Sequence, residues 1–133
     1  MKKECKICLN AMVGNEERVI LRMLESSYKH IDYWVVQCNG SDKTQSIIEE
    51  FYKEKNIPGF TYKHDWDYPG VNRDHTLQTA LKSDHECDWI LRMDADEQLE
   101  VDDDFDWTPL NDTSIQSFNM TAMGAGSIYF RTW

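Results

Sequence analysis

Two aspartates, Asp94 and Asp96, are the residues best placed to do chemistry in this sequence. They stand one residue apart, directly after residues 89–93, which are apolar except for Arg92 and predict a buried strand that carries both carboxylates at its end. Hard divalent cations prefer oxygen ligands, and Mg²⁺ typically takes one or two carboxylates together with substrate phosphates. Because a turn here can aim both side chains at one point, the spacing predicts a site for a divalent cation at Asp94 and Asp96.

Other interpretations of this pair exist. A calcium loop of the EF-hand type needs Gly at its sixth position and Glu at its twelfth. Counted from Asp94, those positions hold Leu99 and Phe105, so that interpretation fails. A phosphatase motif of similar form expects Thr or Val where Gln98 stands. A solvated acidic loop stays open beside the metal site, because residues 94–106 are rich in acids.

The elements that must position the two aspartates alternate along the chain. Apolar runs predict strands, and apolar residues at helical spacing predict helices between them. Such alternation indicates an α/β fold in which a mostly parallel sheet is flanked by helices. The predicted strands are 7–13, 33–38, 60–63 and 88–93. The first and third predicted helices are 16–28 and 71–82, and the second follows the turn at 39–42 and ends at about residue 55. The acids Glu16 and Glu17 suit the first turn of the first helix.

Three polar segments follow predicted strands: 14–16, 37–42 and 94–96. In parallel sheets flanked by helices, ligands bind beyond the carboxyl ends of the strands. We therefore expect these three segments to meet at one crevice.

The last part of the chain has a different pattern. Residues 114–122 and 127–133 alternate apolar and polar side chains, and Gly and Ala at 124–126 separate them, which predicts a short hairpin. We expect the aromatic strand 127–133 to lie at a surface, where exposed strands favour pairing with another chain. The sequence on this basis predicts a homo-oligomer.

Composition excludes several function classes. A chain of 133 residues fits one domain. Its net charge of −10 and lack of a basic run argue against nucleic acid and against anionic membrane surfaces. No apolar stretch approaches the roughly 18–20 residues of a membrane span. We expect a cytoplasmic protein.

The spacing of Cys5 and Cys8 invites a zinc or redox interpretation. A structural zinc site needs four ligands, but Cys38 and Cys87 stand alone in the sequence. Cys8 lies in an apolar run, so a small buried hydrophobic side chain is the favoured interpretation.

Over residues 6–100 the sequence resembles the family 2 glycosyltransferases, which have the GT-A fold. The resemblance rests on four segments that occur in the family's order. They are the first strand with Asn15-Glu16-Glu17, the second strand with Asp42-Lys43-Thr44, Arg73 at the opening of the third helix, and residues 88–97 with Asp94 and Asp96.

The resemblance implies roles for individual residues. Asp96 would ligate Mn²⁺ or Mg²⁺, Asp94 would contact the ribose hydroxyls or the metal, and Arg73 would approach the diphosphate. The remaining residues would line the nucleoside pocket of a nucleotide-sugar donor: Ala11, Glu16, Gln37, Asn39 and Asp42. Gln37 stands where the family usually has Asp, and Asp74 stands where it has Asn.

The implied activity is transfer of a hexose from a UDP-sugar such as UDP-glucose to a hydroxyl acceptor, with inversion and slow donor hydrolysis. Residues 1–133 would form one minimal domain, in which 1–99 bind the donor and 100–133 are a short extension. Family members normally continue past this point with the acceptor region, so the base is open among Asp65, Asp67 and Glu97. Alternatives are a non-catalytic donor-binding module of a split enzyme and a metal-dependent phosphohydrolase.

Overall fold

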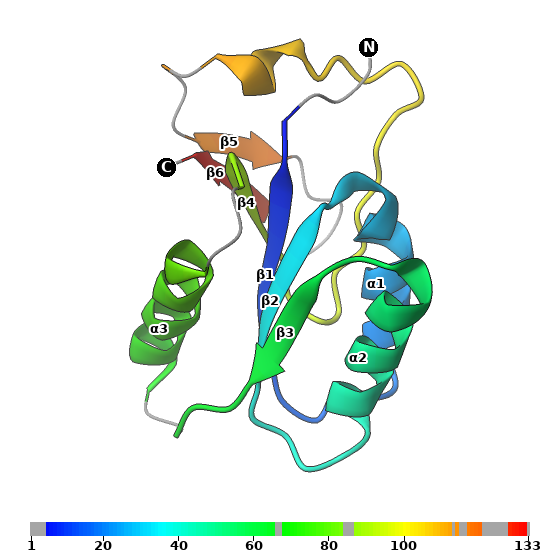
Figure 1. Cartoon of the computed structure of the whole chain (residues 1–133), viewed down its shortest axis with the longest axis vertical. Helices are drawn as coiled ribbons and strands as arrows, with labels where there is room; N and C mark the ends of the chain where they lie inside the picture. Colours follow the sequence, from blue (N-terminus) through cyan, green and yellow to red (C-terminus); the bar gives the residue numbers. More distant parts are fainter. Residues whose placement is uncertain are drawn as a thin grey trace.

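The computed structural model describes residues 5–65, 68–83, 87–112, 114, 117–120 and 128–132. Within those residues six strands form one sheet in the order β3-β2-β1-β4-β6-β5 (Figure 1). The strands are β1 (Ile7–Val13), β2 (Tyr33–Cys38), β3 (Gly59–Tyr62), β4 (Trp89–Arg92), β5 (Ser117–Met120) and β6 (Ile128–Thr132). The helices are α1 (Ile20–Ser27), α2 (Thr44–Lys55) and α3 (Pro69–Lys82), with 3₁₀ turns η1 (Tyr28–His30) and η2 (Thr108–Asn111). None of these helices is both long and apolar enough to cross a membrane.

The first four strands run parallel. β1 pairs with β2 on one side and with β4 on the other, and β3 pairs with β2. The strand order therefore reverses between β1 and β4. β6 pairs antiparallel with β4, and β5 pairs antiparallel with β6. The predicted α/β architecture, a mostly parallel sheet flanked by helices, is confirmed.

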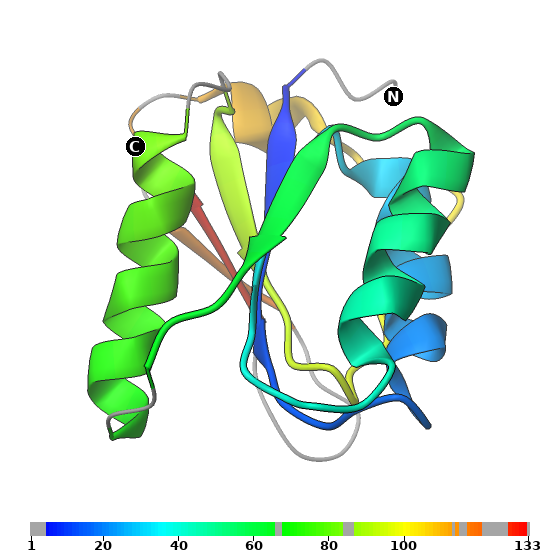
Figure 2. The same ribbon diagram turned by 60° about the horizontal axis from the view of Figure 1, so that its bottom comes forward.

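Helices cover both faces of the sheet. Figures 1 and 2 show α1 and α2 together on one face and α3 on the other. Successive β1 residues alternate between the two faces: Leu9 packs in the larger core cluster with Met23 of α1, and Cys8 packs in a smaller cluster with Leu77 of α3. Two covered faces explain why β1 and β2 are almost continuously buried, as is typical of parallel strands.

Helix α1 begins at Ile20 rather than at Glu16. The Glu16 carbonyl accepts hydrogen bonds from the Val19 and Ile20 amides at 3.0 and 2.9 Å, so the preceding residues form a turn that leads into the helix. The prediction that Glu16 and Glu17 occupy the first helical turn is wrong, because that turn contains no acid. The Glu16 amide donates to Thr44 Oγ1 at the start of α2, and the Glu17 amide donates to Asp42 Oδ2 just before it.

The predicted C-terminal hairpin is present as the β5–β6 pair. Its expected turn at 124–126 lies outside the described residues. Within residues 128–132, β6 lies between β4 and β5 and is paired on both sides, so this strand is not an edge of the described sheet. The expectation that residues 127–133 lie at a surface stays a prediction. The edges of the sheet are β3 and β5. The homo-oligomer likewise stays a prediction.

Both cysteines of the Cys5–Cys8 pair are buried, with exposed fractions of 6% and 2%. Cys8 is not in a disulfide, and it packs against apolar neighbours from β2, β4 and α3. This surrounding agrees with the prediction of a small buried hydrophobic side chain.

Candidate functional site

Asp94 and Asp96 lie on the loop that follows β4. Met93 and Ala95 are 3% and 5% exposed and belong to the larger core cluster, whereas both aspartates are exposed. Buried apolar residues therefore alternate with exposed acids. The apolar residues anchor the loop, and this anchoring leaves both carboxylates at the surface.

Glu97 closes this loop into a turn. Its amide donates to the Asp94 carbonyl at 3.0 Å, and its Oε1 accepts from the Asp94 amide at 2.7 Å. Burial raises the pKa of Glu97, the hydrogen bond from Asp94 lowers it, and the nearby Asp94 and Asp96 carboxylates raise it again. Glu97 is thus within electrostatic reach of both aspartates.

Helix α1 holds the other side of the loop. Arg22 Nη2 donates to the Asp96 carbonyl at 3.1 Å, and Ser26 Oγ accepts from the Leu99 amide at 3.0 Å. These bonds use backbone atoms of the loop. Within the described part of the chain, the carboxylates of Asp94 and Asp96 accept no hydrogen bond and form no ion pair.

The topology places this loop at the reversal of strand order. The amide of Met93 donates to the carbonyl of Asn10 at 3.3 Å, which ties the end of β4 to β1. In open sheets of this kind, ligands bind in the crevice outside the carboxyl ends of the strands where the order reverses. The two unpartnered carboxylates therefore lie at the end of the sheet where ligands bind in folds of this kind.

The loops after β1 and β2 are locked together beside it. Asn15 Oδ1 accepts from the amides of Ser41 and Asp42 at 2.8 and 3.1 Å. Asp42 in turn accepts from the Glu17 amide at 3.3 Å and from the amide and hydroxyl of Thr44 at 2.9 and 2.5 Å. These bonds, the Thr44 hydroxyl first, lower the pKa of Asp42. The Asp42 carboxylate is thus occupied within the protein.

Glu16 and Asn39 belong to the same pair of loops. The Glu16 amide donates to Thr44 Oγ1 at 2.8 Å, and the Asn39 amide donates to the Val13 carbonyl at 3.0 Å. Asn39 Oδ1 accepts from the His64 amide at 3.3 Å. Both residues are partly exposed, so they can border a ligand in the crevice.

Ala11 and Gln37 are buried. Ala11 is 3% exposed and lies in the larger core cluster. Gln37 is 0% exposed; its Nε2 donates to Asn72 Oδ1 at 3.0 Å, and its Oε1 accepts from the Tyr62 hydroxyl at 3.0 Å. Direct contact between the Gln37 amide and a nucleobase would require these internal bonds to be exchanged.

Arg73 lies on α3, which begins at the same end of the sheet where the parallel strands finish (Figures 1 and 2). It is exposed, and among the described residues its guanidinium has no hydrogen-bond or ion-pair partner. Arg92 Nη2 donates to the Arg73 carbonyl at 3.4 Å, which links the end of β4 to the start of α3. Arg73 is therefore available for an anionic ligand near this end of the sheet.

A buried polar contact that the sequence reasoning missed fixes α3 on the sheet. Asn10 Nδ2 donates to the Val35 carbonyl and to the carbonyl and hydroxyl of Thr76, at 3.1 to 3.2 Å. Asn10 Oδ1 is buried and has no partner among the described residues. The sequence did indicate such a contact, because Asn10 lies inside an otherwise apolar strand and a buried side-chain amide needs hydrogen-bond partners.

The donor set fits a divalent cation that binds together with a phosphate. No group of three or more His, Cys, Asp or Glu side chains in the described residues could hold a metal by itself. Two free carboxylates suit a cation such as Mg²⁺, which completes its shell with water and substrate phosphates rather than an all-protein cage. Of the alternatives for a base, Glu97 lies beside the pair, Asp65 is exposed after β3, and Asp67 lies outside the described residues.

The described residues form an α/β protein with a mostly parallel sheet flanked by helices. No protein-family model matches the sequence, and no curated protein matches it. Among solved structures, the chain is similar to the mannosyltransferase PcManGT from Pyrobaculum calidifontis, in complex with GDP-Man and Mn²⁺. The TM-score is 0.64 and the identity 17%, over 88% of this chain and 35% of that one. The likeness is one of fold, and the chain spans about a third of that structure's length.

Proposed function

We propose that the chain is a metal-dependent glycosyltransferase domain that moves a hexose from a nucleotide-sugar, a UDP-sugar such as UDP-glucose, to a hydroxyl acceptor. The observation that carries the proposal is the pair of unpartnered carboxylates, Asp94 and Asp96, beside the reversal of strand order. The likeness of fold to a mannosyltransferase in complex with GDP-Man and Mn²⁺ supports it.

In this proposal each residue has a role that its position allows. Asp94 and Asp96 hold Mn²⁺ or Mg²⁺, which when bound offsets the charge of the leaving diphosphate. Arg73 donates to the diphosphate through its planar fork of N–H groups. The nucleoside pocket is framed by Glu16, Asn39 and Asp42 from the locked loops, with Ala11 and Gln37 in the buried strands behind them.

The acceptor hydroxyl attacks the anomeric carbon opposite the leaving diphosphate, which inverts the configuration there. Glu97 is the carboxylate nearest the pair that can take the hydroxyl proton, because one of its oxygens is not used by the Asp94 amide. The other residues of the site lower the reaction barrier mainly by holding the donor and the acceptor next to each other. Water in place of the acceptor gives slow donor hydrolysis.

A nucleotide-release assay tests this function. The chain is incubated with UDP-sugars and with GDP-Man, with and without Mn²⁺, and nucleoside diphosphate is measured. We expect release from at least one donor only with the metal, and its loss in Asp96→Ala. No release from any donor, or full release by Asp96→Ala, would contradict the proposal.

A second candidate is a nucleotide-sugar-binding module without catalysis. It is favoured by one observation: Glu97, the proposed base, already accepts the Asp94 amide in the turn. This candidate predicts Mn²⁺-dependent donor binding in titration calorimetry together with no release. Release of inorganic phosphate instead of nucleoside diphosphate would indicate a phosphohydrolase.

A further inference from the structure

Four side chains from three elements form a continuous hydrogen-bonded chain beneath α3. His75 Nδ1 lies 3.1 Å from the Tyr62 hydroxyl, which donates to Gln37 Oε1 at 3.0 Å. Gln37 Nε2 donates to Asn72 Oδ1 at 3.0 Å, and Asn72 Nδ2 donates to the Tyr68 carbonyl at 3.3 Å. Gln37 and Asn72 are both 0% exposed, so bulk water does not reach their amide groups.

The chain can run in one direction only. A backbone carbonyl only accepts, so Asn72 must offer Nδ2 to Tyr68 and Oδ1 to Gln37. Gln37 must then donate through Nε2 and accept through Oε1, which takes the single proton of the Tyr62 hydroxyl. The His75 nitrogen facing that hydroxyl must consequently carry a proton of its own.

We propose that this one-way chain positions the first turns of α3, and with them Arg73, and that it holds neutral His75 in the tautomer protonated on Nδ1. The chain ends at the Tyr68 carbonyl, which also accepts the Val71 and Asn72 amides at the start of the helix. Arg73 is the next residue along. Its role toward the diphosphate rests on the proposed function, whereas the direction of the chain does not.

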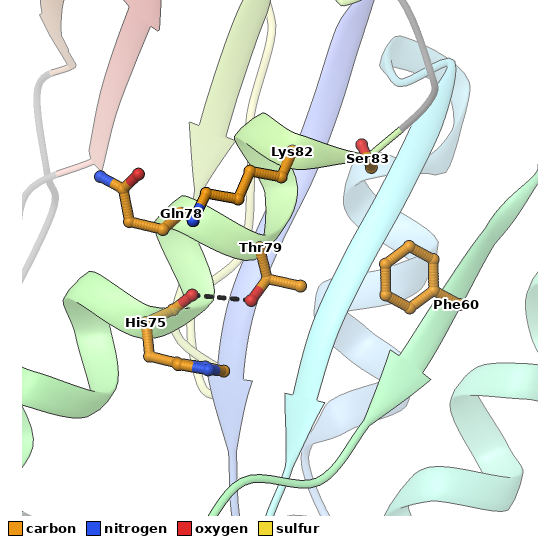
Figure 3. Close-up of a pocket in the computed structure, with 6 residues that line it drawn as sticks. All are labelled: Phe60, His75, Gln78, Thr79, Lys82 and Ser83. Carbon is orange, nitrogen blue, oxygen red and sulfur yellow. Dashed lines mark hydrogen bonds between the residues drawn. The ribbon is translucent and has the colours of Figure 1, made fainter.

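The proposal leaves Nε2 as the only site at which His75 gains a proton. His75 borders a pocket of about 390 Å³ between α3 and β3, together with Phe60 and Lys82 (Figure 3). The groups that face it are Tyr62, the stacked ring of His64 at 3.6 Å, Lys82 and Asp74. Burial, then His64 and Lys82, lower the pKa of His75. Because Nδ1–H persists when Nε2 is protonated, we expect the chain to survive this titration.

The tautomer is measured directly from the ¹⁵N shifts of the His75 ring in the whole chain, above and below its pKa. We expect Nδ1–H and an unprotonated Nε2 in the neutral form, the reverse of the tautomer that usually predominates in water. A neutral His75 protonated on Nε2 would overturn the proposal.

Substitutions at Gln37 test transmission along the chain. Gln37→Met removes the acceptor and frees the Tyr62 proton, so His75 should shift toward Nε2–H. Among the described residues, Gln37 itself forms side-chain hydrogen bonds with Tyr62 and Asn72 and not with His75. Gln37→Glu keeps an oxygen facing Tyr62 and should keep Nδ1–H.

Tyr62→Phe should shift the tautomer as Gln37→Met does, and this variant tests the proposal if the Gln37 variants do not fold. Tyr28→Phe, on the other face of the sheet, is the matched control. An unchanged tautomer in Tyr62→Phe would overturn the chain.

Positioning of α3 is measured by amide hydrogen exchange. Gln37→Met should accelerate exchange at Val71, Asn72 and Arg73 by about five- to tenfold, the effect of one lost net hydrogen bond, and leave the last turn of α3 unchanged. Nucleotide-sugar affinity should fall by a similar factor. Unchanged exchange in the first turns would overturn the positioning role. If the wild-type chain binds no nucleotide-sugar, the proposed function fails, and the tautomer and exchange results still decide this proposal.

Discussion

Two loops at the same end of the sheet contain aspartates whose carboxylates differ in their hydrogen bonding. After β2, Asp42 accepts hydrogen bonds from Glu17 and Thr44, and its carboxylate is used to lock two loops together. After β4, the turn around Asp94 and Asp96 is closed by backbone atoms and by Glu97, and both carboxylates stay without partners among the described residues.

The difference teaches how an acidic side chain can be assigned a structural or a ligand-binding role. A carboxylate whose lone pairs are satisfied by nearby donors stabilises the fold and has a lowered pKa, as Asp42 has. A carboxylate without such donors keeps its oxygens available to a cation. The same residue type is thus a loop lock at one strand end and a candidate metal ligand at the next.

The largest expected effect is on the free carboxylates. Asp96→Asn removes a charged metal ligand, so Mn²⁺-dependent affinity for a nucleotide-sugar should fall by more than about 100-fold, the consequence of losing several kcal/mol of charge stabilisation. Stability should change by less than about 0.5 kcal/mol, because the carboxylate supports no contact. Titration calorimetry measures the first and thermal unfolding the second. Glu100→Gln, an exposed acid on the same segment, is the control, and equal losses in both variants would contradict the assignment.

A smaller effect is expected where the locked loops touch. A Cβ at Gly40 would lie 2.5 Å from the carbonyl carbon and oxygen of Gly14, whereas a Cβ at Gly14 would meet nothing within 4 Å. Gly40→Ala should therefore cost about 1–3 kcal/mol by forcing the loops apart, and Gly14→Ala should be nearly neutral. Chemical denaturation compares the two variants. Equal stabilities would mean that the contact between the loops does not stabilise the fold.

The smallest effect is the acid dependence that Asp42 contributes. Its folded-state pKa is lowered, so its stabilisation is fully present above the ordinary Asp value of about 3.9 and is lost as pH falls through the lowered value. Thr44→Val removes the hydroxyl that contributes most, and the melting temperature should then depend less steeply on pH below about 4. Thr44→Ser retains the hydroxyl and should keep the wild-type slope. A slope that Thr44→Val leaves unchanged would count against this role of Asp42.

Much of the architecture could be predicted because its signals are local. Apolar runs identified the four parallel strands, and helical spacing identified α2 and α3 to within about two residues. The start of α1 could not be predicted, because Glu16 and Glu17 have the composition of a helical first turn while their amides bond to Thr44 and Asp42, more than twenty residues away.

The candidate site could be predicted only in part, because some of its features are local in the sequence and others depend on distant residues. Asp94 and Asp96 are recognisable from their spacing after an apolar strand, whereas the burial of Gln37 depends on Tyr62 and Asn72, which belong to other elements. Asn10 shows the same limit: its need for partners is evident in the sequence, but Thr76 as the partner is not.

The sequence by itself determined the alternation of strands and helices and the delivery of two aspartates to the end of a buried strand, because periodicity and neighbour spacing are local properties. Only the tertiary structure decided that β4 lies beside β1, that β6 is internal, and which carboxylates are occupied and which are free. Those outcomes depend on strand order and on donors distant in the chain. A hydrogen bond needs both partners within about 3 Å, and the folded backbone alone establishes that proximity.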